Sequence, residues 1–232
     1  MAKTVVAGGI FAVGRSTYLL AGLLTLLILY PYLLEGTFEQ RLVIGFLNVA
    51  ILVAAARVAT ATWHAFVAVV IFLGLPSLGL QAAYLLTDNA LIGELLPLIY
   101  MVFYLFTIGH VLRYVLAPGQ VTSDKIQGAI AAYILIGMVW ATLYVLVDRL
   151  HPGSFTDSAR GNAASEVEAE DLLYFSFVTL TTTGYGDVAP VSAHARSLAI
   201  LEQLAGTFYI AILIARLTGL YQGRARRGAD QE

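Results

Sequence analysis

The sequence predicts an all-α membrane protein with six transmembrane helices and one short re-entrant helix between the fifth and the sixth. Three observations lead to this fold class. Hydrophobic residues make up 59% of the 232 residues and charged residues only 12%, about half of the usual charged share of a soluble domain. Six apolar runs approach or exceed the roughly 20 residues that a membrane span requires. A seventh apolar run is too short to span and leads into a segment that disfavours helix.

The first four apolar runs form a predicted N-terminal transmembrane region over residues 1–116. They cover residues 17–34, 42–59, 63–86 and 91–116. Pro76 is expected to kink the third run, because proline removes a helix hydrogen bond. Residues 117–124 combine Pro and Gly with polar residues and are expected to form a cytoplasmic linker.

The fifth and last apolar runs belong to a second predicted region over residues 125–221. The fifth covers 126–147, the last covers 195–221, and residues 222–232 are expected to form a short cytoplasmic tail. Between these two spans, a short helix is predicted over 166–181, and Ser165 and Glu168 have the spacing of a capping box. Irregular backbone after such a helix persists at membrane depth only beside protein or a water-filled pore.

Basic residues near the span ends predict the orientation in a plasma membrane. With both termini in the cytoplasm, nine of the 13 Lys and Arg residues fall on the inner side. The net charge of −2 gives no reason to expect a nucleic-acid partner, and there are no cysteines. Clustered metal ligands, nucleophile–base pairs and phosphate-binding loops are not evident in the sequence. We therefore expect a membrane protein that is not an enzyme and has neither a cofactor nor a small-molecule substrate.

Residues 181–187 read Thr-Thr-Thr-Gly-Tyr-Gly-Asp. This string resembles the potassium-channel selectivity filter, usually Thr-Val-Gly-Tyr-Gly-Asp, with Thr183 at the valine position. The resemblance covers about residues 123–221. It implies a homotetramer around a central pore, and a filter formed by Thr182, Thr183, Gly184, Tyr185 and Gly186 in which K⁺ binds at the first four.

The chemistry of such a filter explains its residue types. A cation that leaves water needs oxygen ligands, and rings of backbone carbonyls supply them. An ordinary strand alternates its carbonyls, so some residues must take left-handed conformations, which Gly184 and Gly186 adopt without steric cost. The resemblance implies that Tyr185 packs against Tyr174 and Phe175, and that Asp187 at the outer mouth accepts a hydrogen bond from Tyr174.

In the last span, the resemblance places Gly206 at a hinge, although close helix packing is the other interpretation. Thr207, Ile210 and Ile214 are implied to line the cavity and the gate, or else to pack against neighbouring helices. Glu202 is an acid inside a span and hence a functional candidate. Either it is a protonated or hydrogen-bonded carboxyl that braces the pore helix through Thr179 or Thr181, or it lies in a wet crevice between subunits.

The sequence thus predicts a potassium-selective channel. Voltage dependence should be weak or absent, because the fourth run contains only Arg113 where a sensor needs a series of basic residues. Two alternatives remain open, a nonselective cation channel and a regulatory membrane subunit that does not conduct.

Overall fold

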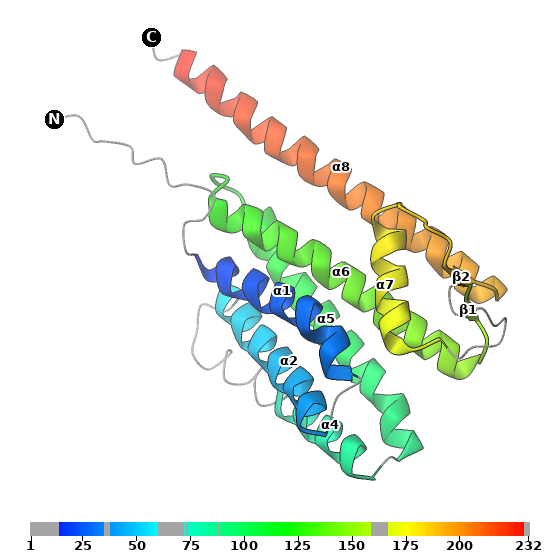
Figure 1. The fold of residues 1–232 in the computed structure, drawn as a ribbon. Helices are drawn as coiled ribbons and strands as arrows, with labels where there is room; N and C mark the ends of the chain where they lie inside the picture. The colour runs from blue at the N-terminus through cyan, green and yellow to red at the C-terminus, as the bar shows by residue number, and fades with distance from the viewer. Residues whose placement is uncertain are drawn as a thin grey trace.

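The computed structural model describes residues 14–34, 38–59, 72, 74–87, 89–158 and 167–229, and these are mostly helical (Figure 1). The helices are α1 (Arg15–Leu34), α2 (Phe38–Ala59), α4 (Leu75–Thr87), α5 (Ala90–Leu116), α6 (Ser123–Leu150), α7 (Ala169–Leu180) and α8 (Ala193–Ala229). Two short strands, β1 (Phe155–Asp157) and β2 (Val188–Pro190), complete the described elements.

Three of the described helices are long and apolar enough to cross a membrane, over residues 91–116, 123–150 and 193–216. Two shorter apolar helices cover 15–30 and 42–55. Residues 63–71 and 73 of the predicted third span lie outside the described residues, and α4 corresponds to its last part. Helix α8 continues to Ala229, so it includes most of residues 222–232, the predicted cytoplasmic tail. Hydropathy marks where a chain leaves the membrane, whereas the arginines and alanines that follow are good helix formers.

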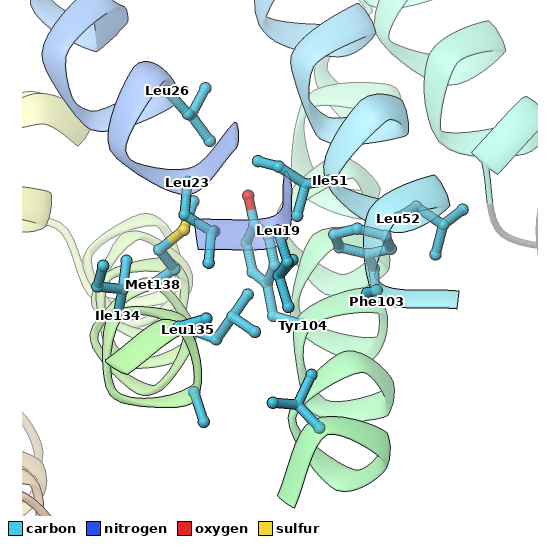
Figure 2. Packing of buried hydrophobic residues seen from close by; sticks show 14 of the residues in the cluster. Leu19, Leu23, Leu26, Ile51, Leu52, Phe103, Tyr104, Ile134, Leu135 and Met138 are labelled. Atoms are coloured by element: carbon cyan, nitrogen blue, oxygen red, sulfur yellow. The ribbon is translucent and has the colours of Figure 1, made fainter. Parts of the chain in front are cut away.

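The main apolar core lies where α1, α2, α5 and α6 meet (Figure 2). Its fully or almost fully buried members include Leu19 and Leu23 of α1, Ile51 of α2, Phe103 of α5 and Leu135 of α6. In lipid, helices associate through close packing and interhelical hydrogen bonds, because the surrounding tails are equally apolar. We call α1, α2, α4 and α5 the leading bundle.

Hydrogen bonds also hold the leading bundle together. The Tyr104 hydroxyl of α5 donates to Asn48 Oδ1 of α2 at 2.7 Å, and Asn48 Nδ2 donates to the Ile44 carbonyl at 3.0 Å. Tyr104 and Asn48 are both buried. The interior of the bundle thus satisfies the polar groups of this pair within its own helices.

Helix α6 connects the leading bundle to the rest of the chain, because it packs against α1 and α5 as well as α7 and α8. Asp124, in its first turn, accepts a 2.8 Å hydrogen bond from the Ser16 backbone N–H at the start of α1. The other Asp124 oxygen accepts from the Tyr114 hydroxyl near the end of α5. One carboxylate therefore joins three helix ends. We call α6, α7, α8 and the loops between them the C-terminal unit.

Strands β1 and β2 pair antiparallel, with Phe155 opposite Pro190 and Asp157 opposite Val188. The Val191 N–H donates to the Ser154 carbonyl at 2.8 Å and extends the contact. The two-stranded sheet joins the end of α6 to the start of α8, and it lies at the end of the molecule opposite the last turns of α8 (Figure 1).

Candidate functional site

Helix α7 is the predicted short helix, and it begins at Ala169 rather than 166 and ends at Leu180 rather than 181. Its capping box joins Glu168 and Asp171, and the Asp171 side chain accepts from the Glu168 N–H at 2.9 Å. The sequence predicted a capping box between Ser165 and Glu168, which placed the helix start three residues too early. Ser165 itself lies outside the described residues. Acidic residues in this first turn match the positive end of the helix dipole.

The backbone of residues 181–187 alternates in handedness. Thr182, Gly184 and Gly186 have φ of 58°, 63° and 79°, whereas Thr183 and Tyr185 between them do not have positive φ. Left-handed backbone suits glycine, and Gly184 and Gly186 take the left-handed conformations that were expected of them. Thr182 is unexpected, because a β-branched residue at positive φ costs of order 1–3 kcal/mol. Such strain persists only where the surroundings impose it.

Hydrogen bonds to the last turn of α7 hold Thr182 in this conformation. The Thr182 N–H donates to the Thr179 carbonyl at 2.9 Å, and the Thr183 N–H donates to the Val178 carbonyl at 2.9 Å. The Thr181 and Thr183 hydroxyls lie 2.9 Å apart. Within the described part of the chain, the carbonyl oxygens of residues 182–186 accept no hydrogen bond.

The far end of the loop is fixed by Asp187. Its Oδ2 accepts from the Tyr174 hydroxyl at 2.6 Å, the bond that the resemblance implied, and its Oδ1 accepts from the Val188 N–H at 2.9 Å. The Asp187 carbonyl accepts from both the backbone N–H and the hydroxyl of Ser158, at 2.8 and 2.9 Å. The bond from Tyr174 lowers the pKa of the Asp187 carboxyl and raises the pKa of the Tyr174 hydroxyl to about 12.

The chain is similar to several known proteins. A family model described as an ion channel matches residues 128–222. Protein LctB of Geobacillus stearothermophilus is 33% identical over 103 residues, 43% of this chain and 75% of that protein. Protein LctB of Bacillus caldotenax is 29% identical over 101 residues, with the same shares covered.

This chain belongs to the ion channel family. Two pore potassium channel c of Oryza sativa subsp. japonica is another similar protein, 36% identical over 84 residues, which are 36% of this chain and 16% of that protein. No solved structure matches the chain. The match to the channel family starts within α6 and ends within α8, so it covers the C-terminal unit and omits the leading bundle.

The resemblance to potassium channels implied that Phe175 packs against Tyr185, but in this chain its neighbours are other aromatic residues. Its ring packs edge-on against Tyr144 of α6 and Phe155 of β1, with centroids 5.1 and 5.5 Å apart, and it is buried. It therefore fastens α7 to α6 and the sheet. Tyr185 is 72% exposed in the single chain.

Glu202 of α8 is fully buried and contacts both other helices of the C-terminal unit. It lies 2.5 Å from the Tyr144 hydroxyl of α6 and 2.6 Å from the Ser176 hydroxyl of α7. The contact with α7 is made through Ser176, not through Thr179 or Thr181 as expected, and the Thr181 hydroxyl bonds the Phe177 carbonyl instead. Sequence reasoning missed Ser176 and Tyr144, since neither is unusual in an apolar helix until the helices cross.

Gly206 is a packing glycine in this structure. A Cβ at this position would lie 2.3 Å from the carbonyl oxygen of Leu180, the last residue of α7. The Leu180 carbonyl also accepts from the Tyr133 hydroxyl of α6 at 3.1 Å. The absence of a side chain at 206 therefore lets α8 touch the end of α7.

Much of the remaining surface of α8 is exposed in the single chain. Glu202, Gly206 and Tyr209 lie on the side that packs against α6 and α7. Thr207, Ile210 and Ile214, the predicted cavity and gate residues, are exposed, and so are residues 181–186. Among the described residues, no group of three His, Cys, Asp or Glu could hold a metal ion through side chains.

Proposed function

We propose that this chain is one subunit of a potassium-selective channel and that four copies assemble around a pore formed by residues 182–186. The observation that carries the proposal is the alternation of backbone handedness at Thr182, Gly184 and Gly186. Alternating left- and right-handed residues turn successive carbonyls toward the same side, whereas a strand points them to opposite sides. The N–H groups of Thr182 and Thr183 bond to α7, and the carbonyl oxygens are left for an ion.

A single loop can supply only part of an ion's ligand shell. K⁺ that leaves water needs oxygens on all sides, and fourfold cyclic symmetry repeats each carbonyl as a ring. The exposure of residues 181–186 and of one face of α8 supports an assembly that covers them. The Thr182 hydroxyl then adds a side-chain ring at the inner end of the filter.

Helix α7 supports cation entry through its direction. Its N-terminus carries Glu170 and Asp171, and its C-terminal residue is Leu180 beside the filter. The last carbonyls of a helix hold about half a negative charge, which favours a cation in front of them.

We further propose six spans with both termini in the cytoplasm of a plasma-membrane protein, and weak or absent voltage dependence. Among the described residues of α5, Arg113 is the one arginine. Each elementary charge that crosses the field gains about 2.3 kcal/mol per 100 mV, so steep gating needs many such charges.

The test is ion flux in liposomes that contain the purified protein. Potassium flux without sodium flux is expected for the wild type, together with a tetrameric mass in native mass spectrometry. Sodium flux equal to potassium flux would favour the nonselective cation channel. No flux from a folded tetramer would favour the regulatory subunit, and a monomer would refute the proposal.

Two glycine variants make a matched pair for this test. Gly186 and Gly153 have φ of 79° and 80°, and a Cβ at either position meets no atom within 4 Å. Gly186→Ala and Gly153→Ala should therefore cost a similar folding free energy, of order 1–2 kcal/mol. Only Gly186→Ala should lower the K⁺/Na⁺ flux ratio. Equal flux ratios for both variants would contradict a filter at 182–186.

A further inference from the structure

Glu202 lies at the junction of the three helices of the C-terminal unit, where its hydrogen bonds can be counted. The Tyr144 hydroxyl of α6 lies 2.5 Å from Oε2. The Ser176 hydroxyl of α7 lies 2.6 Å from Oε1 and also 2.7 Å from the Gly137 carbonyl of α6. Glu202, Tyr144 and Ser176 are fully buried, so water does not reach these groups in the chain as described.

The number of protons decides which form of Glu202 fits. A hydroxyl has one proton, whereas a carbonyl and an ionised carboxylate only accept. The Tyr144 hydroxyl donates its hydrogen bond to Oε2. If Glu202 were ionised, Ser176 Oγ would have one proton for two acceptors, and one of its two short contacts would join oxygens with no proton between them.

A neutral carboxylic acid satisfies every contact. The Oε1–H group donates a hydrogen bond to Ser176 Oγ, and the Ser176 hydroxyl donates one to the Gly137 carbonyl. The hydrogen bonds therefore run from Oε1–H through the serine hydroxyl to the backbone of α6, while Oε2 accepts from Tyr144.

The charges around Glu202 favour the same form. Within the described ranges, no lysine, arginine or histidine forms an ion pair with it. An ionised carboxylate that is buried at membrane depth without a basic partner is strongly disfavoured.

We propose that Glu202 is held as a neutral acid and is a positioning residue that fixes α7 against α6 and α8 through Ser176, Tyr144 and the Gly137 carbonyl. This inference rests on the proposed channel function, because its purpose is to hold the helix that carries the filter. Gly137 takes part through its backbone, and a Cβ there would meet the Phe177 ring at 2.9 Å. The hydrogen bonds between Glu202, Ser176 and the Gly137 carbonyl therefore need a close approach of α6 and α7.

Glu202→Gln is the informative variant. A glutamine carbonyl accepts from Tyr144, and its amide N–H donates to Ser176, so it reproduces the hydrogen bonds of the neutral acid but not those of a carboxylate. We expect Glu202→Gln to keep potassium flux and K⁺/Na⁺ selectivity within about twofold of wild type, whereas Glu202→Ala loses at least about tenfold because it leaves buried hydroxyls unpaired.

Infrared spectroscopy of the wild type at neutral pH reports directly whether the Glu202 carboxyl is protonated, which the flux of the variants does not. A protonated-carboxyl C=O band that shifts in D₂O should be present in wild type and absent from Glu202→Gln. Thr142→Val is the control for hydroxyl loss, because among the described residues the Thr142 hydroxyl bonds only the Met138 carbonyl of its own helix. It should keep both the band and the flux.

The inference is overturned if the wild type lacks the band, or if Glu202→Gln is as defective as Glu202→Ala. The spectra use wild type and Glu202→Gln, so they decide the question even if Glu202→Ala does not fold. If wild-type protein carries no potassium, the channel proposal fails, while the band still reports the state of Glu202.

Discussion

The leading bundle and the C-terminal unit differ in how their residues are packed and in the strain of their backbones. In the leading bundle, buried leucines and the Asn48–Tyr104 bond complete a core within one chain. In the C-terminal unit, the loop at 181–187 and much of α8 stay exposed, and the backbone is strained at Thr182. Among the described residues, strain at Thr182 sets the C-terminal unit apart, and the match to the ion channel family, residues 128–222, falls within this unit.

The largest effect is expected from Gly206→Ala in the C-terminal unit. The added Cβ would lie 2.3 Å from the Leu180 carbonyl, a backbone atom that cannot rotate away. We expect a loss of about 3 kcal/mol or more in unfolding free energy, and loss of potassium flux. Thermal unfolding in detergent and liposome flux measure both.

Gly109→Ala in α5 is the matched control, because a Cβ there meets nothing within 4 Å. It should stabilise its helix by about 0.5–1 kcal/mol. If the two alanine variants behaved alike, a close approach of α8 and α7 at Gly206 would not be needed for folding or flux.

The next effect concerns the outer end of the proposed filter. Tyr174→Phe removes the 2.6 Å bond to Asp187 and should lower the K⁺/Na⁺ flux ratio. Because that bond lowers the pKa of Asp187, its contribution to stability is present above the ordinary pKa of about 3.9 and is lost as pH falls through the depressed value. Tyr174→Phe should therefore move acid inactivation to higher pH.

Flux measured against pH checks this shift, with Tyr32→Phe as control, because Tyr32 is 73% exposed on α1. An unchanged acid midpoint in Tyr174→Phe would show that another group sets the acid limit.

A smaller effect is expected in the leading bundle. Tyr104→Phe leaves Asn48 Oδ1 without its donor and should destabilise the fold by about 0.6–1.7 kcal/mol, the usual range for polar contacts between membrane helices. The K⁺/Na⁺ flux ratio should stay at the wild-type value. A changed ratio would mean that the leading bundle shapes the filter, and the two regions would be less separate than proposed.

The smallest effect is expected from Arg113→Gln. Arg113 is exposed near the end of α5, and one charge per subunit supplies little gating energy. The slope of the conductance–voltage curve should not change. A steep wild-type curve that flattens in this variant would contradict the proposed voltage independence.

Residues whose role follows from local chemistry were predictable from the sequence. Gly184 and Gly186 stood out through the resemblance to a potassium-channel filter, and their positive φ fits the freedom of glycine. Glu202 stood out because an acid is costly inside a span. Thr182 was missed at positive φ, since threonine usually avoids that region and only the bonds to α7 hold it there.

Residues whose role depends on how helices cross could not be predicted. Ser176 is an ordinary small polar residue until α7 places it between Glu202 and Gly137. Phe175 likewise looked like a partner of Tyr185, and only the packing of β1 against α6 shows why it faces Tyr144. Helix starts were also imprecise, because several acids near Glu168 can cap α7.

The closeness of Gly206 to Leu180 has a mechanical consequence. Where two backbones touch without side chains between them, neither helix can rotate or slide without displacing the other. In the proposed channel, a movement of α8 that widens the inner end of the pore would therefore reach the base of the filter through a single peptide group, and opening at one end would alter ion binding at the other.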